Sequence, residues 1–163
     1  MGQSQLYSVP VVVSEDGLVY IGSFAEKLES VQEFINTKGA FLWKEDLKKT
    51  KQATDELEAY LSGKKQCFSS EIDFLWGTSF QQQVWQCLLK IPFGKSSSYT
   101  EVAQTLGRPQ AVRAVGSAIG RNPLSIVVPC HRVLTKDGRL GGYSGGLDMK
   151  KTLLAIEGIT YRI

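Results

Sequence analysis

A cysteine and the only histidine of the chain stand next to each other, at Cys130 and His131. A thiol is a weak nucleophile until it loses its proton, because the thiolate is the form that attacks. An imidazole is a base that can take up such a proton near neutral pH. The pair is therefore the smallest set of groups that could make a sulfur nucleophile.

The segments on either side of this pair must position it. The apolar run 126–128 leads toward the cysteine and predicts a strand. Beyond the pair, a tightly turned loop is expected around Tyr143 and Ser144, because they are flanked by Gly138, Gly141, Gly142, Gly145 and Gly146. A final helix should run from Leu147 to Glu157 and end at Gly158, the residue type that most often closes helices.

Two short helices are expected upstream of the pair. The sequence Ser98–Glu101 has the pattern of a capping box and predicts a helix that continues through Leu106. Gly107–Pro109 then turns the chain into another helix, with Pro109 in its first turn, that runs to about Arg121. Two short helices joined by a glycine-containing turn predict a helix-turn-helix.

The second of these helices has two distinct faces when its residues are placed at 100° intervals. The face expected to be buried holds Ala111, Val112, Val115, Ala118 and Ile119. The opposite face holds Gln110, Arg113, Gly116, Ser117, Gly120 and Arg121. Each exposed glycine costs about 1 kcal/mol of helix stability relative to alanine, which indicates that something approaches the helix closely. The arginines favour a polyanion in that place, and tight packing against a neighbouring helix is the alternative.

The first half of the chain predicts a scaffold. We expect a hairpin with an Asp-Gly turn, two helices and a strand, at 8–22, 28–35, 55–61 and 68–74 respectively. No residue in this part has an obvious chemical role. The expected architecture is an α/β N-terminal domain with a small sheet, residues 1–76, followed by a mainly α domain with the helix-turn-helix, residues 77–163. The second domain should open with a capping box at Ser79–Gln82.

Composition limits the remaining possibilities. With 42% hydrophobic and 21% charged residues, the 163-residue chain is typical of globular proteins. No apolar run is long enough to span a membrane and the N-terminus has no secretory signal, so we expect no membrane partner. A net charge of +3 permits contact with nucleic acid without requiring it. Arg108, Arg121 and Arg132 are candidates for phosphate contacts.

Cysteine and histidine are too scarce for a metal site. Three cysteines and one histidine could form a zinc site only by using the candidate nucleophile itself. We therefore expect neither a metal nor another cofactor, and the free thiols suit a reducing cytoplasm. Cys67 and Cys87 have apolar neighbours and are expected to be inert core thiols.

Four motifs occur in a fixed order: Gly120–Pro123, Pro129–Val133, Gly142–Leu147 and Leu153–Gly158. Together they resemble the O6-alkylguanine-DNA alkyltransferases. The resemblance covers about Ser79 to Gly158. The preceding 75 residues match only in length and in general α/β character.

The resemblance implies that the partner is double-stranded DNA bearing alkylated guanine, bound by a monomer. In the family the helix-turn-helix enters the minor groove, which Gly116, Ser117 and Gly120 would allow by their small size. Arg113 would fill the gap left by an everted base, with Arg121 as a further DNA contact. Eversion is needed because a side chain cannot reach the target atom of a base inside a duplex.

The resemblance also implies the chemistry. Cys130 would displace guanine from the alkyl carbon, with His131 as base through a bridging water and Glu157 orienting the imidazole. Tyr99 would protonate the departing guanine, and Asn122 would hold the active-site turn. Because a thioether resists hydrolysis, the protein should be consumed stoichiometrically.

The base pocket follows from the same resemblance. The Tyr143 ring would stack on the base and the Ser144 backbone would donate to its oxygen. The carbonyl groups of Cys130 and Val133 would accept from the exocyclic amine, and the Tyr99 hydroxyl would complete the pocket.

Three other functions compete with this interpretation. An alkyltransferase-like module binds the lesion without chemistry, but such modules replace the acceptor cysteine, and Cys130 is present. A DNA-binding regulator would leave the Cys-His motif and the glycine-rich loop unexplained. A cysteine hydrolase would need a separate histidine, and the chain has only one.

Overall fold

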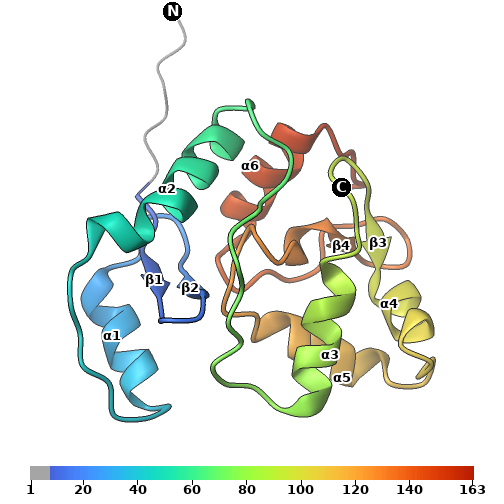
Figure 1. Ribbon diagram of the computed structural model, residues 1–163. Helices are drawn as coiled ribbons and strands as arrows, with labels where there is room; N and C mark the ends of the chain where they lie inside the picture. Colours follow the sequence, from blue (N-terminus) through green and yellow to red (C-terminus); the bar gives the residue numbers. More distant parts are fainter. Residues whose placement is uncertain (1–7) are drawn as a thin grey trace, which may run out of the picture.

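The computed structural model describes residues 8–163, in which a small sheet with two helices stands beside a mainly helical part (Figure 1). The N-terminal elements are β1 (Val11–Val13), β2 (Leu18–Ile21), α1 (Leu28–Asn36) and α2 (Leu47–Leu61). They are followed by α3 (Ser79–Leu88), β3 (Ser97–Ser98), α4 (Tyr99–Thr105), α5 (Val112–Gly120), a 3-10 turn (Cys130–Arg132), β4 (Val133–Leu134) and α6 (Leu147–Glu157). Within these residues, no helix has the length and apolar character needed to cross a membrane.

The predicted hairpin is confirmed. Strands β1 and β2 pair antiparallel, and the turn between them is closed by a hydrogen bond from the Ser14 amide to the Gly17 carbonyl, 2.8 Å long. Gly17 has a φ of 155°, and a Cβ atom there would lie 2.7 Å from the Glu71 carbonyl oxygen. Only glycine fits a backbone that passes so close to another chain segment.

Helix α2 is longer than the sequence pattern indicated. The prediction covered 55–61, whereas the helix begins at Leu47, after the Asp46 side chain accepts a hydrogen bond from the Lys49 amide at 3.0 Å. Its first two turns are rich in lysine and present no apolar stripe, so periodicity could not reveal them. Asp46, a residue type that often precedes the first turn of a helix, was the sequence signal that could have predicted this start.

The strand predicted at 68–74 is wrong. This segment pairs with Leu18 of β2 at a single bridge and then separates from it. Glu56 of α2 holds the start of the segment instead, by accepting from the Ser69 amide at 2.6 Å and the Ser70 hydroxyl at 2.5 Å. The start of the segment is therefore held by α2, and its bonds to Leu18 of β2 are made only by Glu71 and Asp73.

Both predicted capping boxes exist, one of them shifted by a residue. Helix α4 begins after Ser98, whose hydroxyl and amide exchange hydrogen bonds with Glu101, each 3.1 Å long. Helix α3 is capped by Thr78 and Gln81 rather than by the predicted pair beginning at Ser79. A threonine caps as well as a serine, so the sequence contained both solutions.

Helix α5 has the predicted buried and exposed faces but starts later. It begins at Val112. Pro109, which was expected in the first turn of this helix, lies instead in the turn between α4 and α5. Val115, Ala118 and Ile119 are buried as expected, whereas Ala111 and Val112, expected on the same face, are only half-buried. The helix therefore turns its polar face outward.

The strand predicted at 126–128 is also wrong, although the segment is buried. Ile126 has a φ of 73°, which breaks an extended conformation. Asn122 closes the turn from inside: its side-chain oxygen accepts from the Leu124 amide and its amide donates to the Val128 carbonyl, both at 2.9 Å. The segment that precedes Cys130 is therefore a compact turn and not a strand.

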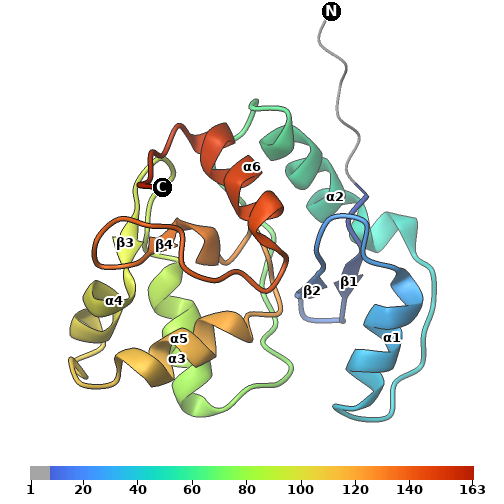
Figure 2. The same ribbon diagram turned by 180° about the vertical axis from the view of Figure 1, so that it is seen from behind.

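One apolar core joins the two halves of the chain. A single cluster of buried side chains includes Leu18 and Leu57 from the first half, and Trp85, Val115 and Leu153 from the second. Helices α2 and α6 lie side by side in both views of the molecule (Figures 1 and 2). The helix predicted at 147–157 has those bounds and ends at Gly158, which places Glu157 in its last turn.

Candidate active site

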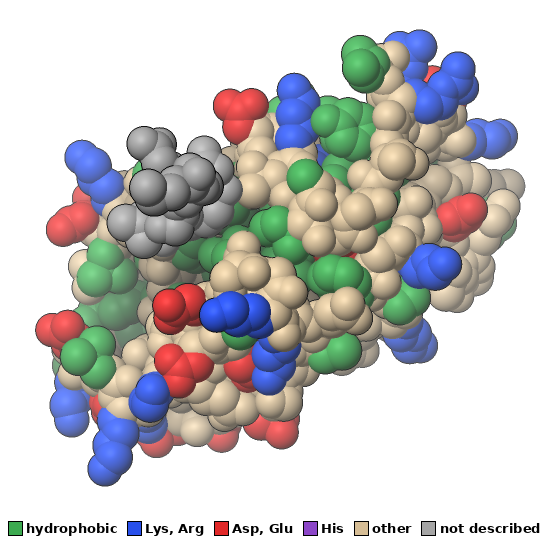
Figure 3. Space-filling view, turned by 90° about the horizontal axis from the view of Figure 1, so that it is seen from above, with side chains coloured by type: hydrophobic (Ala, Val, Ile, Leu, Met, Phe, Trp, Pro, Cys, Tyr) green, Lys and Arg blue, Asp and Glu red, His purple; other side chains and the backbone are tan. Residues whose placement is uncertain are grey.

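The Cys130–His131 pair lies on the 3-10 turn at the centre of the C-terminal part. Cys130 is 4% exposed and His131 is fully buried. No histidine is visible on the face shown in Figure 3, where basic side chains are spread out and not gathered in one patch. Within residues 8–163, the imidazole is bonded to Glu157, and no hydrogen bond joins it to the thiol.

The His131 imidazole is tied to the carboxylate at the end of α6. Its Nε2 lies 2.5 Å from Glu157 Oε2, and Arg132 Nε donates to Glu157 Oε1 at 2.7 Å. Burial opposes ionisation of Glu157, but hydrogen bonds from His131 and Arg132 outweigh it and lower the pKa of that carboxyl to about 2. The carboxylate is thus ionised, and its charge is balanced by Arg132.

His131 is held neutral, with one nitrogen free. Burial lowers the pKa of its imidazole more than the carboxylate of Glu157 raises it. An ionised carboxylate can only accept, so the proton of the neutral ring is on Nε2. The other nitrogen, Nδ1, is buried and has no hydrogen-bond partner in the described part of the chain. This is the arrangement of a base whose accepting atom is available.

Two opposing effects act on the pKa of the Cys130 thiol. Burial raises the pKa of Cys130, while the polar side chains of Asn122 and Tyr143 and the charge of Lys150 lower it. The net direction is upward, so the thiol is protonated at rest. A base must therefore remove its proton before it can attack.

Tyr99 reaches the same place from the start of α4. A Cβ atom on Gly141 would lie 3.2 Å from the Tyr99 hydroxyl oxygen, so the glycine-rich loop can pass close to it only without a side chain. Burial raises the pKa of Tyr99, and the proximity of Cys130 adds to the effect. The phenol is therefore neutral at ordinary pH.

The chain is similar to known proteins over most of its length. The family model described as 6-O-methylguanine DNA methyltransferase, DNA binding domain, matches residues 79–159. The inducible methylated-DNA–protein-cysteine methyltransferase of Bacillus subtilis is 43% identical over 86% of this chain and 79% of its own length. A methylated-DNA–protein-cysteine methyltransferase of Methanosarcina acetivorans is 45% identical over 96% of this chain and 95% of its own.

The chain belongs to the methylated-DNA–protein-cysteine methyltransferase family. The fold agrees with this assignment. The crystal structure of Mycobacterium tuberculosis OGT in complex with DNA has a TM-score of 0.78 and 38% identity, covering 91% of this chain and 85% of that one. The O6-methylguanine methyltransferase of the same organism has a TM-score of 0.70 at 36% identity, covering 93% of each chain.

In this methyltransferase, most of the residues expected on the outer face of α5 are exposed to solvent. Arg113, Ser117, Gly120 and Arg121 are exposed. A Cβ atom on Gly120 would meet nothing within 4 Å, so the glycine leaves open space. Gly116 differs from expectation: it is half-buried, and a Cβ atom there would lie 3.7 Å from the Tyr99 ring.

The expected base-pocket residues of the methyltransferase differ in burial and in hydrogen bonding. The Tyr143 hydroxyl is buried without a hydrogen bond of standard geometry, yet Cys130 and Ser125 both influence its pKa, which burial raises. Val133 is fully buried, and its carbonyl already accepts from Lys150 at 2.8 Å. A carbonyl has two lone pairs, so it can accept from one further donor. Ser144 is exposed.

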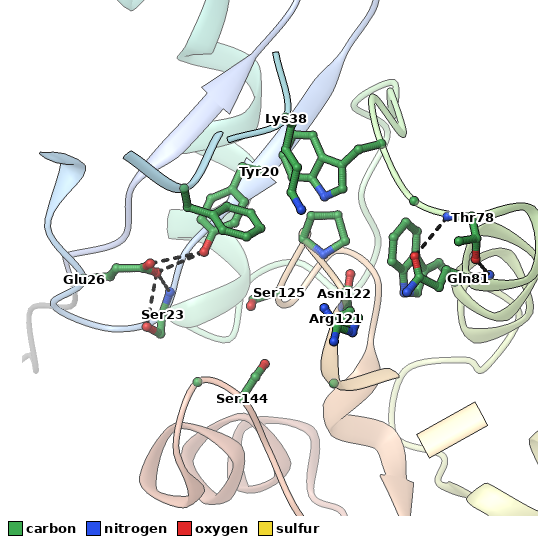
Figure 4. A pocket seen from close by; sticks show the side chains of 17 residues that line it. Tyr20, Ser23, Glu26, Lys38, Thr78, Gln81, Arg121, Asn122, Ser125 and Ser144 are labelled. Carbon is green, nitrogen blue, oxygen red and sulfur yellow. Dashed lines mark hydrogen bonds between the residues drawn. The ribbon is translucent and has the colours of Figure 1, made fainter. Parts of the chain in front are cut away.

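A groove of about 620 Å³ lies between the two halves of the molecule (Figure 4). Its wall includes Gly120 and Arg121 at the end of α5, and Ser144 on the glycine-rich loop. Tyr20 and Lys38 line it from the N-terminal half. Cys130 is not in its lining, so the groove adjoins the reactive centre without containing it.

Three buried polar residues at the site escaped sequence reasoning. Arg132, expected to be solvated or to bind phosphate, is 7% exposed and paired with Glu157. Lys150 is fully buried in α6, where apolar neighbours gave the only hint of a buried face. Tyr60 is fully buried in α2, on the stripe that also holds Leu57.

Lys150 binds the glycine-rich loop to β4. Its ammonium donates to the carbonyl groups of Val133 at 2.8 Å and Gly142 at 3.2 Å, and also to that of Leu140. Burial lowers its pKa to about 8, against the influence of Cys130. At neutral pH it remains a cation close to the thiol.

One prediction about the other thiols is wrong. Cys87 is buried in the core, as expected, but Cys67 is exposed. It lies in the irregular connection that follows α2, so its apolar neighbour Phe68 did not indicate burial.

Proposed function

We propose that the protein repairs DNA by transferring the alkyl group of O6-alkylguanine to its own Cys130. The observation that carries this function is the His131 ring, tied to Glu157 through Nε2 and with Nδ1 free, one residue from the thiol. Membership of the methyltransferase family gives the same activity.

The reaction we propose needs no cofactor. The thiol proton passes to His131 Nδ1 through a water, and the resulting thiolate attacks the alkyl carbon in line with the carbon–oxygen bond. A carbon–sulfur bond forms, the bond to O6 breaks, and Tyr99 supplies a proton to the departing guanine. The imidazolium of His131 then returns its proton to the Tyr99 tyrosinate through solvent, which restores both side chains. Overall, the thiol proton replaces the alkyl group on guanine. Because the thioether is stable in water, each protein molecule acts once.

We propose that α4 and α5 bind the duplex as a helix-turn-helix from the minor groove. The exposure of Arg113 and Ser117 and the open space at Gly120 support close approach of DNA to α5. Arg113 would fill the stack as the damaged base is everted. Arg121, at the groove beside the loop, would contact phosphate.

The everted base would lie against the glycine-rich loop. The Tyr143 ring would stack on it, and the Ser144 amide would donate to its oxygen. The carbonyl groups of Cys130 and Val133 would accept from its amine. Asn122 supports the pocket through the two hydrogen bonds that close the turn before Cys130. Tyr99 closes the other side.

We further propose that the protein acts as a monomer in the cytoplasm. Residues 77–163 would form the DNA-binding and alkyl-acceptor domain, and residues 1–76 a supporting domain. The shared apolar core ties the two together.

Mass spectrometry tests the proposed function. After incubation with O6-benzylguanine, the peptide containing Cys130 should gain one benzyl group, and the Cys130→Ala variant should gain none. Cys67→Ser is the matched control, because Cys67 is exposed and its loss should leave the gain unchanged. An unchanged mass together with tight binding of alkylated DNA would instead identify a lesion-binding module.

A further inference from the structure

A tyrosine from the N-terminal half reaches the buried end of the Cys130–His131 site. Tyr60 is in the last turn of α2, the helix that lies beside α6 in both views (Figures 1 and 2). It is fully buried. Its hydroxyl donates to Glu157 Oε2 at 2.5 Å and lies 3.3 Å from His131 Nε2.

Aromatic contacts hold the Tyr60 ring in this place. Its centroid is 5.4 Å from that of Phe68 and 6.1 Å from that of Phe93, with the second pair nearly perpendicular at 85°. Phe93 also lies under the Arg132 guanidinium, 5.9 Å from its centroid. The hydroxyl is thus aimed at the carboxylate by contacts from both halves of the chain.

The two oxygens of Glu157 have different partners. Oε1 accepts from Arg132 Nε at 2.7 Å and from the Gly94 amide at 3.0 Å. Oε2 accepts from the guanidinium at 3.1 Å, but also from His131 and Tyr60. Tyr60 therefore shares with the imidazole the one oxygen that holds the Nε2 proton.

We propose that Tyr60 is a positioning residue for alkyl transfer: by donating to Glu157 Oε2 it orients the carboxylate and weakens its attraction for the imidazole proton, so that His131 stays neutral with Nδ1 as base. This proposal rests on the proposed function. It also gives the N-terminal half a part in the chemistry.

All charged and titratable groups around the imidazole bear on its protonation. Arg132 from the 3-10 turn and Lys150 from α6 are cations that disfavour the imidazolium. Glu157 favours it, and Tyr60 reduces that effect by occupying the same oxygen. Cys130 precedes His131 directly and is protonated at rest, because burial raises its pKa. Removing the Tyr60 hydroxyl should therefore raise the pKa of His131.

The experiment uses the fact that the chain has one histidine. Imidazole NMR signals then report on His131 alone, in the full-length protein without substrate. In Tyr60→Phe, which keeps the ring, we expect the titration midpoint of His131 to rise by about one pH unit. The acidic limb of the pH–rate profile for O6-benzylguanine transfer should move upward by the same amount, because a protonated base cannot act.

Tyr161→Phe is the matched control, since it removes a hydroxyl from a half-buried tyrosine of a separate apolar cluster. It should leave both the titration and the profile unchanged. A folded Tyr60→Phe with the midpoint and profile of the parent would overturn the proposal.

A second measurement avoids dependence on the stability of the variant. In the parent, the Tyr60 hydroxyl proton should give a slowly exchanging downfield signal with a nuclear Overhauser contact to the His131 ring. Its absence would also overturn the proposal. Because the titration needs no substrate, a parent that titrates as expected but never gains an alkyl group would refute the proposed function and not the hydrogen bond.

Discussion

At the scale of single residues, Cys130 combines burial with reactivity. Burial raises the pKa of the thiol, and the nearby charge of Lys150 only partly offsets this. A protonated thiol is protected from oxidation and from unselective alkylation, because the thiolate is the reactive form. Activation then depends on His131 and on the carboxylate that holds its ring.

Glu157→Gln should slow alkylation of Cys130. The amide is neutral, so the imidazolium formed during the reaction loses its counter-charge and His131 becomes a weaker base. General-base assistance contributes about a hundredfold or more, and we expect a loss of at least tenfold at neutral pH. The rate of benzyl transfer measured against pH checks this. An unchanged profile would remove Glu157 from the relay.

Arg113→Ala should impair repair of duplex DNA while leaving the chemistry intact. The side chain is exposed on α5, and its proposed role is to stabilise the everted base. Loss of that contact should slow repair of a duplex about tenfold or more, since unstacking a base costs a few kcal/mol. Transfer from free O6-benzylguanine needs no eversion and should proceed at the parent rate.

The control for Arg113→Ala is Lys136→Ala, which removes an exposed positive charge outside α5. Repair of the duplex by Arg113→Ala as fast as by this control would show that the arginine has no part in eversion.

At the scale of elements, α6 and the glycine-rich loop act as one unit. Lys150 donates to carbonyl groups of Leu140 and Gly142 in the loop and to Val133 in β4. The loop carries Tyr143 and Ser144, so the lysine fixes the wall of the proposed base pocket. Glycines alone would leave that wall mobile.

Lys150→Met should loosen this loop. Each hydrogen bond from a charged donor contributes about 1.5 kcal/mol or more, so amide hydrogen exchange at 138–146 should accelerate about tenfold. Alkylation should slow as well. Lys151→Met, at the exposed neighbouring position, is the control. Equal exchange in the two variants would show that Lys150 does not hold the loop.

Sequence patterns recovered the elements with strong local signals and missed those decided by distant partners. Helix α6 was predicted to the residue because Gly158 gives a strong local signal for the end of a helix, and Gly158 has the left-handed conformation of a C-cap. The strand predicted at 68–74 is wrong because the start of this segment is held by a carboxylate of α2, Glu56, and not by a neighbouring strand. No local signal could report that distant contact.

The site was predicted in the same uneven way. Cys130 and His131 stand out by type and adjacency, and Glu157, Tyr99 and Asn122 came from the family resemblance. Tyr60 was missed because a tyrosine on a buried helical stripe looks like any core aromatic. Its function depends on where its hydroxyl points, which only the packing of α2 on α6 decides.

At the scale of the whole molecule, one buried carboxylate links the two halves of the chain. Glu157 receives Tyr60 from α2 and Arg132 from the active-site turn. Stability and chemistry thus share a group, and a change of its protonation should affect both.

The stability of the protein should fall as acid protonates Glu157. Its pKa is lowered from an ordinary value of 4.5 to about 2. The stability it contributes is therefore complete above pH 4.5 and is lost as the pH falls toward 2, by about 3 kcal/mol at 1.4 kcal/mol per unit. Urea unfolding at a series of pH values measures this. Glu157→Gln should decline less steeply over that range, and an equally steep decline would contradict the assignment.

The most direct test of the account counts lesions repaired per protein molecule. Protein is mixed with a large excess of DNA containing O6-methylguanine, and restored guanine is measured until the reaction stops. We expect one guanine per molecule, with the methyl group recovered on Cys130 as a thioether. Continued repair beyond one equivalent, or repair by protein whose Cys130 is already alkylated, would contradict irreversible transfer to this thiol.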